Sequence, residues 1–215
     1  MNSFEKGYEF LDVNGIQIHY SLEGDENNPT LVLINMASHN LTSWEIVIDD
    51  FLSEFQILRF DGRGTGLSSF GKDEGFNFSQ YADDLSELMS SLSINKAFVL
   101  GIAYGARTAA QFALRHPDKL TSLALCDVSL SQPVNQTEQG NLGNKARDML
   151  REAGEPIVEY KKYWRFYKDK DAALKFHTAH LKEEDITTEM SKVSVPSLIT
   201  CGRQDMNLNE AEKIL

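Results

Sequence analysis

The sequence predicts an α/β fold: a mostly parallel sheet with helices on both faces and one helical insertion. Short, almost continuous apolar runs such as TLVLIN (30–35) and FQILRF (55–60) are typical of strands covered on both faces. Segments with helical spacing lie between these runs, and this alternation favours right-handed crossovers and a parallel sheet. Polar sequence with a helical pattern interrupts the alternation at residues 130–192.

Apolar periodicity and turn residues place the elements of the first half. IQIHYSLEG (16–24) alternates and then stops at GDENNP, which is typical of a strand followed by a turn. LTSWEIVIDDFLSE (41–54) has helical spacing, with Ser43 as its predicted N-cap. NFSQYADDLSELMSSLSI (77–94) is a second amphipathic helix. Its predicted buried face consists of Phe78, Tyr81, Leu85, Leu88 and Met89.

The alternation continues in the second half. KAFVLGI (96–102) reads as a strand, and ARTAAQFALRHPDKL (106–120) reads as a helix that Pro117 ends. TSLALCDV (121–128) and VPSLITCG (195–202) are the last two predicted strands.

These elements predict how the chain divides. Residues 1–129 and 193–215 form the expected α/β core, and residues 130–192 form a helical cap. We expect the cap to lie over the carboxyl edge of the sheet, where open α/β folds bind their ligands.

Composition and charge exclude several classes of partner. The 215 residues carry a formal net charge of −11, which opposes binding to nucleic acid or to an anionic membrane surface. No apolar run approaches the roughly 20 residues that cross a bilayer, and the first residues lack the apolar stretch of a secretory signal. Two cysteines give neither a disulfide framework nor a metal-ligand cluster. We therefore expect a cytoplasmic protein without metal or cofactor.

The stretch GIAYGA (101–106) joins a predicted strand directly to a helix. Gly101 and Gly105 lie two positions on either side of Ala103, and such small residues let neighbouring elements come close. A turn this sharp strains its central residue, whose side chain then projects above the sheet. The amino end of the following helix favours negative charge at that place.

A glycine-rich loop, DGRGTGLSS (61–69), directly follows the strand that ends at Phe60. Its glycines allow the chain to reverse over the edge of the sheet. The loop has neither the GxxxxGK[ST] pattern nor a dinucleotide fingerprint, so we do not expect it to bind a nucleotide.

Two further motifs follow strands: INMASHNLTSW (34–44) and CGRQD (201–205). With GIAYGA and DGRGTGLSS they form four ordered motifs, and together these resemble the α/β-hydrolase superfamily from about residue 8 to residue 215. Asn35 stands where many members have a His-Gly pair, which is similar to the variant found in 3-oxoadipate enol-lactonases.

The resemblance implies a role for several residues. Ala103 occupies the position of the nucleophile, and Asp205 that of the acid, with Asp127 as the alternative acid. The main-chain N–H groups of Ala37 and Tyr104 would form the oxyanion hole. Backbone donors survive changes of side chain, so we expect the hole to persist.

Two departures from the family pattern argue against catalysis. The methyl group of Ala103 cannot attack a carbonyl carbon. The family's histidine follows the acid, on the loop after an eighth strand, and this sequence ends at Leu215, so we expect the last strand, its helix and that histidine to be absent. A shortened natural relative, a chain cut during preparation and a deliberate replacement of serine would each give this pattern. The histidines present are not expected to substitute: His19, His39, His116, His177 and His180.

Aromatic residues mark the predicted cap. Tyr160, Tyr163, Trp164 and Tyr167 in EYKKYWRFYKDK (159–170) have the spacing of one helical face. This face either packs the cap onto the core or roofs an apolar pocket above Ala103 and Ala37. The lysines and arginine between these residues are either solvated or steer a carboxylate-bearing substrate.

These observations predict a relative of small carboxylic-ester and lactone hydrolases that act by acyl transfer, inactive as written. The alternative is a protein that binds a small ligand, or a partner, on the same scaffold. The expected ligand is a small ester or lactone-like molecule. We also expect an open sheet edge, which a homo-oligomer would cover.

Overall fold

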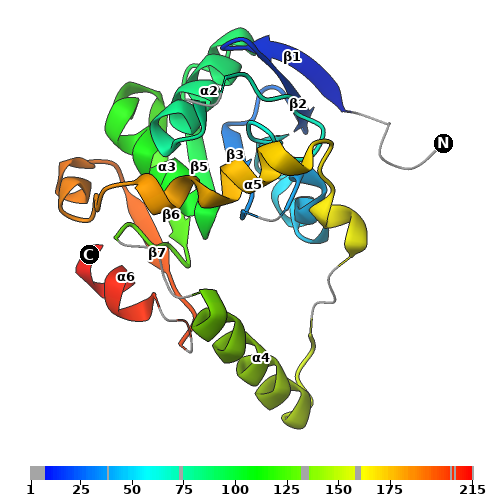
Figure 1. The fold of residues 1–215 in the computed structure, drawn as a ribbon. Coiled ribbons are helices and arrows are strands. Elements are labelled where there is room, and N and C mark those ends of the chain that lie inside the picture. Colours follow the sequence, from blue (N-terminus) through cyan, green and yellow to red (C-terminus); the bar gives the residue numbers. More distant parts are fainter. Residues whose placement is uncertain are drawn as a thin grey trace.

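The structure is a computed structural model that describes residues 8–37, 39–72, 75–131, 136–157, 161–203, 205 and 207–214. It shows the predicted mostly parallel sheet with helices on both faces (Figure 1). None of the helices in these ranges is long and apolar enough to cross a membrane.

The sheet has seven strands in the order β1-β2-β4-β3-β5-β6-β7. The first two pairings, β1 with β2 and β2 with β4, are antiparallel, and all the others are parallel. The sequence did not lead to a prediction of β1, because EFLDV is too short and too polar to indicate a strand. The strands are β1 (Glu9–Val13), β2 (Ile16–Glu23), β3 (Thr30–Ile34), β4 (Gln56–Phe60), β5 (Ala97–Ile102), β6 (Leu120–Cys126) and β7 (Ser197–Thr200).

Helices cover the sheet and connect its strands. The five residues predicted for the inner face of the second helix are all buried, as its period of 3.6 requires. The α-helices are α1 (Ile48–Phe51), α2 (Phe78–Ser91), α3 (Tyr104–Arg115), α4 (Gln136–Glu152), α5 (Lys170–Thr178) and α6 (Leu208–Ile214). The 3-10 helices used below are η2 (Leu41–Ile46), η5 (Lys162–Arg165), η6 (Ala179–Lys182) and η7 (Thr188–Lys192).

Alternate residues of the central strands supply the two sides of the core. Val32 and Val99 pack with the inner faces of α2 and α3 in the larger apolar cluster. Their neighbours Leu31 and Leu100 point the other way and pack with Trp44 and Ile48 under η2 and α1. This alternation is the period of two that a strand imposes on its side chains.

The first predicted helix differs from the prediction in its helix type and in its N-cap residue. Residues 41–54 form the 3-10 helix η2 followed by the single turn α1. Asn40, not Ser43, is the N-cap, and its side chain accepts a hydrogen bond from the Thr42 amide at 3.0 Å. Asn40 also donates from Nδ2 to the Tyr163 carbonyl at 2.7 Å, a contact distant in sequence that favours this residue as the cap.

Between β6 and β7, the described residues form helices and loops, with one isolated bridge between Tyr167 and Gly66. Helix α5 packs on the amino-terminal ends of α2 and α3, where Phe176 joins a small apolar cluster with Phe78 and Tyr81. Helix α4 instead stands away from the sheet (Figure 1). The cap boundaries at 129/130 and 192/193 remain a prediction.

One buried arginine ties the beginning and the end of this helical segment to the core. Arg107 of α3 donates from one nitrogen to the Ser131 carbonyl at 3.0 Å and from another to the Glu184 carbonyl at 2.6 Å. Glu210 of α6 accepts hydrogen bonds from the amides of Leu130 and Ser131. The position of the helical segment over the sheet therefore depends on two charged side chains.

Candidate active site

The turn between β5 and α3 has the strained geometry that its sequence predicted. Ala103 has φ 52° and ψ −109°, a conformation that L-residues rarely adopt. Its amide donates to the Cys126 carbonyl at 2.8 Å, and helix α3 begins at the next residue. The side chain of residue 103 is therefore set by the backbone at the carboxyl edge of the sheet.

The two flanking glycines are required by close backbone contacts. A Cβ atom on Gly101 would lie 2.3 Å from the Gly105 carbonyl oxygen. A Cβ atom on Gly105 would lie 2.4 Å from the Ile34 oxygen and 2.5 Å from the Asn35 oxygen. The start of α3 thus packs directly against the end of β3, which brings the loop after β3 beside the turn.

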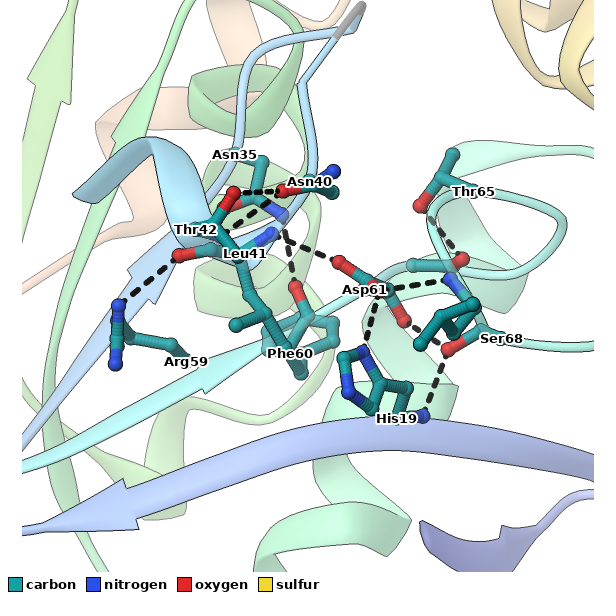
Figure 2. A network of polar contacts seen from close by, with 12 residues as sticks. His19, Asn35, Asn40, Leu41, Thr42, Arg59, Phe60, Asp61, Thr65 and Ser68 are labelled. Carbon is teal, nitrogen blue, oxygen red and sulfur yellow. Dashed lines mark hydrogen bonds and ion pairs between the residues drawn. The ribbon is translucent and has the colours of Figure 1, made fainter. Parts of the chain in front are cut away.

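Asn35 braces this loop. Its Nδ2 donates to the Phe60 carbonyl at 2.9 Å, and its Oδ1 accepts from the indole Nε1 of Trp44 at 2.6 Å (Figure 2 shows the first contact). The side chain is buried and lines a cavity of only about 20 Å³ beneath the loop. Asn35 does not line the larger cleft described below.

The two predicted oxyanion donors are half-buried main-chain groups. Neither the Ala37 nor the Tyr104 N–H donates to another group within the described ranges. The side chain of Tyr104 points elsewhere: its ring packs between Phe78 and Phe176, and its hydroxyl donates to the Phe176 carbonyl. Burial is the largest cause that raises the pKa of Tyr104, so this hydroxyl stays protonated.

A cleft of about 570 Å³ opens beside the turn. Ile102 and Met36, the residues before Ala103 and Ala37, contribute to its wall. The described lining is mostly apolar, and Arg147 of α4 is the one residue among those described that carries a permanent charge. The remaining lining residues are His39, Ser43, Trp44, Ile46, Val47, Gly143, Leu150, Pro156, Ile157 and Trp164.

The two candidate acids lie on neighbouring loops. The Asp127 side chain accepts a hydrogen bond from the Gly202 amide at 2.9 Å, and the Asp205 side chain accepts from the Asn207 amide at 2.8 Å. A Cβ atom on Gly202 would lie 3.7 Å from Cβ of Asp205 and 3.9 Å from Oδ1 of Asp127, so both carboxyl groups flank this glycine. Burial and then these two carboxylates raise the pKa of Cys201 to about 11, which keeps its thiol protonated.

The histidines are engaged away from both acids. His19 pairs with Asp61 and His116 with Asp83, while His177 contacts the Tyr167 hydroxyl and His180 contacts the His177 carbonyl. None of the described histidines hydrogen-bonds to Asp127 or Asp205.

His39 is the histidine that lines the cleft. Burial, and secondarily the charge of Arg165, lower the pKa of His39 to about 4. The imidazole is therefore neutral at neutral pH. Its ring centroid lies 6.0 Å from that of Trp164.

The predicted aromatic helix of the cap is wrong. Of the described residues 161–169, those of η5 are helical, while Phe166 and Lys168 lie outside it. Backbone groups of this segment hydrogen-bond to the core instead of to one another. The Trp164 carbonyl accepts from the Asn40 amide at 2.8 Å, and the Lys168 amide donates to the Gly66 carbonyl at 3.0 Å.

The four aromatic residues consequently do not share one face. Trp164 is buried and lines the cleft. Tyr163 faces a different cleft, and Tyr167 donates to or accepts from His177 at 3.1 Å. Tyr160 lies outside the described residues.

Most of the lining residues were not foreseen from the sequence, among them Arg147, Leu150 and Ile157 of the helical segment. They occur in polar, helical sequence whose periodicity says which residues share a helix face, not which element that face meets. An apolar residue such as Leu150 in this mostly polar helix is the kind of signal that could have indicated a contact with the cleft.

Comparison with known proteins gives a consistent result. Residues 29–157 match the family described as alpha/beta hydrolase fold. Epoxide hydrolase 3 from Xenopus tropicalis is 30% identical over 120 residues, which cover 55% of this chain and 33% of that protein. The chain therefore matches only a third of that relative's length.

Longer matches extend over most of the chain. The 3-oxoadipate enol-lactonase 2 from Acinetobacter baylyi is 21% identical over 215 residues, covering 91% of this chain and 78% of the relative. The crystal structure of the enol-lactonase from Burkholderia xenovorans LB400 superposes with a TM-score of 0.77 at 23% identity, covering 96% of this chain and 86% of that one.

Proposed function

Because the chain belongs to the α/β-hydrolase fold family, we propose that its 570 Å³ cleft binds a small ester or lactone-like molecule without transferring an acyl group. The observation that carries this proposal is Ala103, whose backbone has φ 52° at the turn where the family places its nucleophile. The position keeps its strained geometry but offers only a methyl group.

The cleft suits a compact, mostly apolar ligand. Its apolar lining removes a ligand body from water. We expect the amides of Ala37 and Tyr104, which donate to no other group within the described ranges, to donate to the carbonyl oxygen of the ligand. Arg147 adds one positive charge at the rim. The relatives named as enol-lactonases support a lactone or ester as the ligand class.

Acyl transfer needs more than this cleft provides. A nucleophile must attack the carbonyl carbon, and a base must remove its proton. Ala103 has no attacking atom, and neither Asp205 nor Asp127 holds a histidine in the part of the chain described. We therefore expect ligand binding with negligible turnover.

The test uses the chain's own fluorescence. Trp44 and Trp164 are its two tryptophans, and both line the cleft. Phenyl butyrate and ε-caprolactone should change the fluorescence in a saturable way, while 4-nitrophenyl butyrate should be hydrolysed no faster than in buffer. Sustained turnover of the nitrophenyl ester would contradict the proposal and favour hydrolysis, the second candidate function, which the retained backbone geometry supports.

A pair of variants tests whether the ligand occupies this cleft. Leu150→Arg places a charge in the lining and should weaken binding about fivefold, the cost of losing about 1 kcal/mol of apolar contact. Leu181→Arg is the control, because it changes another exposed leucine that does not line the cleft, and it should have no effect on binding. Ala103→Ser should not create activity, because the serine would lack a base. Equal affinities of both arginine variants would contradict the assignment of the cleft.

A further inference from the structure

A second cleft, of about 630 Å³, lies on the other side of η5 and shares no lining residue with the first. The carboxyl end of β4 and the glycine-rich loop supply its floor, and η5 supplies its rim. It is lined by His19, Asn40, Thr42, Asp61, Gly66, Leu67, Lys162, Tyr163, Arg165 and Phe166.

A buried histidine–aspartate pair forms the floor (Figure 2). Nδ1 of His19 lies 2.7 Å from Oδ2 of Asp61. The same carboxylate accepts from the Leu41 amide at 2.8 Å and from the Leu67 amide at 2.9 Å. Its oxygens are therefore satisfied by the protein and do not need a cation from the cleft.

This pairing determines what His19 offers to a ligand. Because the Asp61 carboxylate is an acceptor, Nδ1 of His19 carries the proton that it donates to Asp61, and Nε2 is the ring nitrogen left for a ligand. The rings of Tyr8 and Phe10 hold the imidazole, with centroids 5.2 and 5.0 Å away. Nε2 has no hydrogen-bond partner within the described ranges, although His19 is only 3% exposed. Nε2 is therefore the ring nitrogen that can hydrogen-bond to a ligand in this cleft.

The rim is positively charged. Lys162 is exposed and makes no ion pair within the described part of the chain, and Arg165 stands beside it at the end of η5. The other polar groups are engaged: the Thr42 hydroxyl donates to Asn40 at 2.6 Å, and the Tyr163 hydroxyl donates to Glu45. Leu67 and Phe166 provide apolar surface, and the Phe166 side chain is 48% exposed.

We propose that this second cleft binds a small hydroxylated carboxylate. The hydroxyl hydrogen-bonds to Nε2 of His19, the carboxylate faces Lys162 beside Arg165, and the apolar body lies against Leu67 and Phe166. The hydroxyl thus meets a ring nitrogen that has no other hydrogen-bond partner within the described ranges, and the anion meets the exposed Lys162 ammonium. This site goes beyond the proposed function and does not depend on it.

Three probes separate the contributions of the ligand groups. Mandelate carries both the hydroxyl and the carboxylate, phenylacetate lacks the hydroxyl, and mandelamide lacks the charge. Titration calorimetry on the whole chain should give mandelate the tightest binding, by about fivefold or more over each analogue, the usual effect of one hydrogen bond or one exposed ion contact. Equal affinity for all three probes would overturn the proposal.

Two variants assign these effects to residues. His19→Asn keeps an N–H donor for Asp61 but removes Nε2, so it should bind mandelate and phenylacetate equally. Lys162→Gln should weaken mandelate about fivefold and leave mandelamide unchanged. Lys96→Gln is the matched control, because this exposed lysine lies far along the chain in the turn before β5.

The outcomes remain decisive even when one variant fails to fold. The probe series and Lys162→Gln test the site without changing its buried floor, and thermal unfolding reports the state of His19→Asn. Leu150→Arg in the first cleft should leave mandelate binding unchanged. Loss of mandelate binding in Leu150→Arg but not in Lys162→Gln would place the ligand in the first cleft and overturn the proposal.

Discussion

Ala103 is held in a strained backbone conformation at the turn between β5 and α3. Its φ of 52° is imposed by the close packing of Gly101 and Gly105, which leaves the chain no space for a relaxed turn. Such conformations cost about 1 to 3 kcal/mol and persist only where the surroundings enforce them. At this turn the strained residue carries only a methyl group.

The strain can be measured with a substitution that releases it. Ala103→Gly should raise the free energy of unfolding by about 1 kcal/mol, because glycine adopts positive φ freely and its own entropy cost of about 0.5 to 1 kcal/mol does not cancel the gain. Urea unfolding measures this change, provided that the dependence of the free energy of unfolding on urea concentration is the same in the variant and the wild type. Ala113→Gly, in the regular part of α3, should instead destabilise the protein by at least about 1 kcal/mol. A destabilised Ala103→Gly would mean that the turn is not strained.

Among the elements, η5 connects the cap to the loop that follows β3. Glu45 of η2 receives three donors from the cap side: Lys161 at 2.6 Å, the Trp164 indole at 3.2 Å and the Tyr163 hydroxyl. Burial opposes the charged form, but these hydrogen bonds outweigh it and lower the pKa of Glu45 below its ordinary value of 4.5. The two clefts lie on either side of this junction.

Glu45→Gln should loosen the junction and reduce the free energy of unfolding by about 1 kcal/mol at neutral pH, a modest value because the carboxylate is 33% exposed and screened by solvent. The folded pKa of Glu45 is lowered, so its contribution is fully present above pH 4.5 and is lost as the pH falls through the folded pKa. The difference between wild type and variant should therefore shrink in acid.

Asp49→Asn is the control, because this neighbouring carboxylate is exposed and receives no side-chain hydrogen bond or ion pair within the described residues. Hydrogen exchange at residues 161–168 should rise in Glu45→Gln and stay at the wild-type level in Asp49→Asn. Identical exchange in both variants would show that Glu45 does not hold the segment.

At the scale of the whole molecule, β7 forms one edge of the sheet. Its outward residues are exposed, and Leu198 is 59% exposed. An edge strand with apolar side chains readily pairs with another chain. The expected homo-oligomer remains a prediction, and we propose that this edge is where copies of the chain meet.

Light scattering after size exclusion tests this proposal. The wild-type chain should be dimeric at micromolar concentration, and Leu198→Lys should shift it to the monomer, because a lysine on an edge strand opposes pairing. Leu181→Lys is the matched control for Leu198→Lys, because Leu181 is also 59% exposed but lies on η6 instead of the edge strand. A monomeric wild type, or equal effects of the two lysines, would remove the edge as an interface.

Sequence prediction succeeded where the cause was local. The inner face of α2 followed from spacing alone, and Ala103 was located because Gly101 and Gly105 mark a turn that few other residue pairs allow. It failed at residues 159–170, where spacing indicated a helix. There the Trp164 carbonyl and the Lys168 amide bond to Asn40 and Gly66, and such partners cannot be read from a local window.

The sequence by itself determined the α/β class, the position of the strained turn and the chemical inertness of residue 103, because these depend on periodicity, glycine sterics and one side chain. Only the tertiary structure decided which residues line each cleft, that Asn35 braces a loop, and that the His19–Asp61 pair lines the same cleft as Lys162. These properties arise where segments far apart in the chain meet, and the free energy of such contacts has no counterpart in a local pattern.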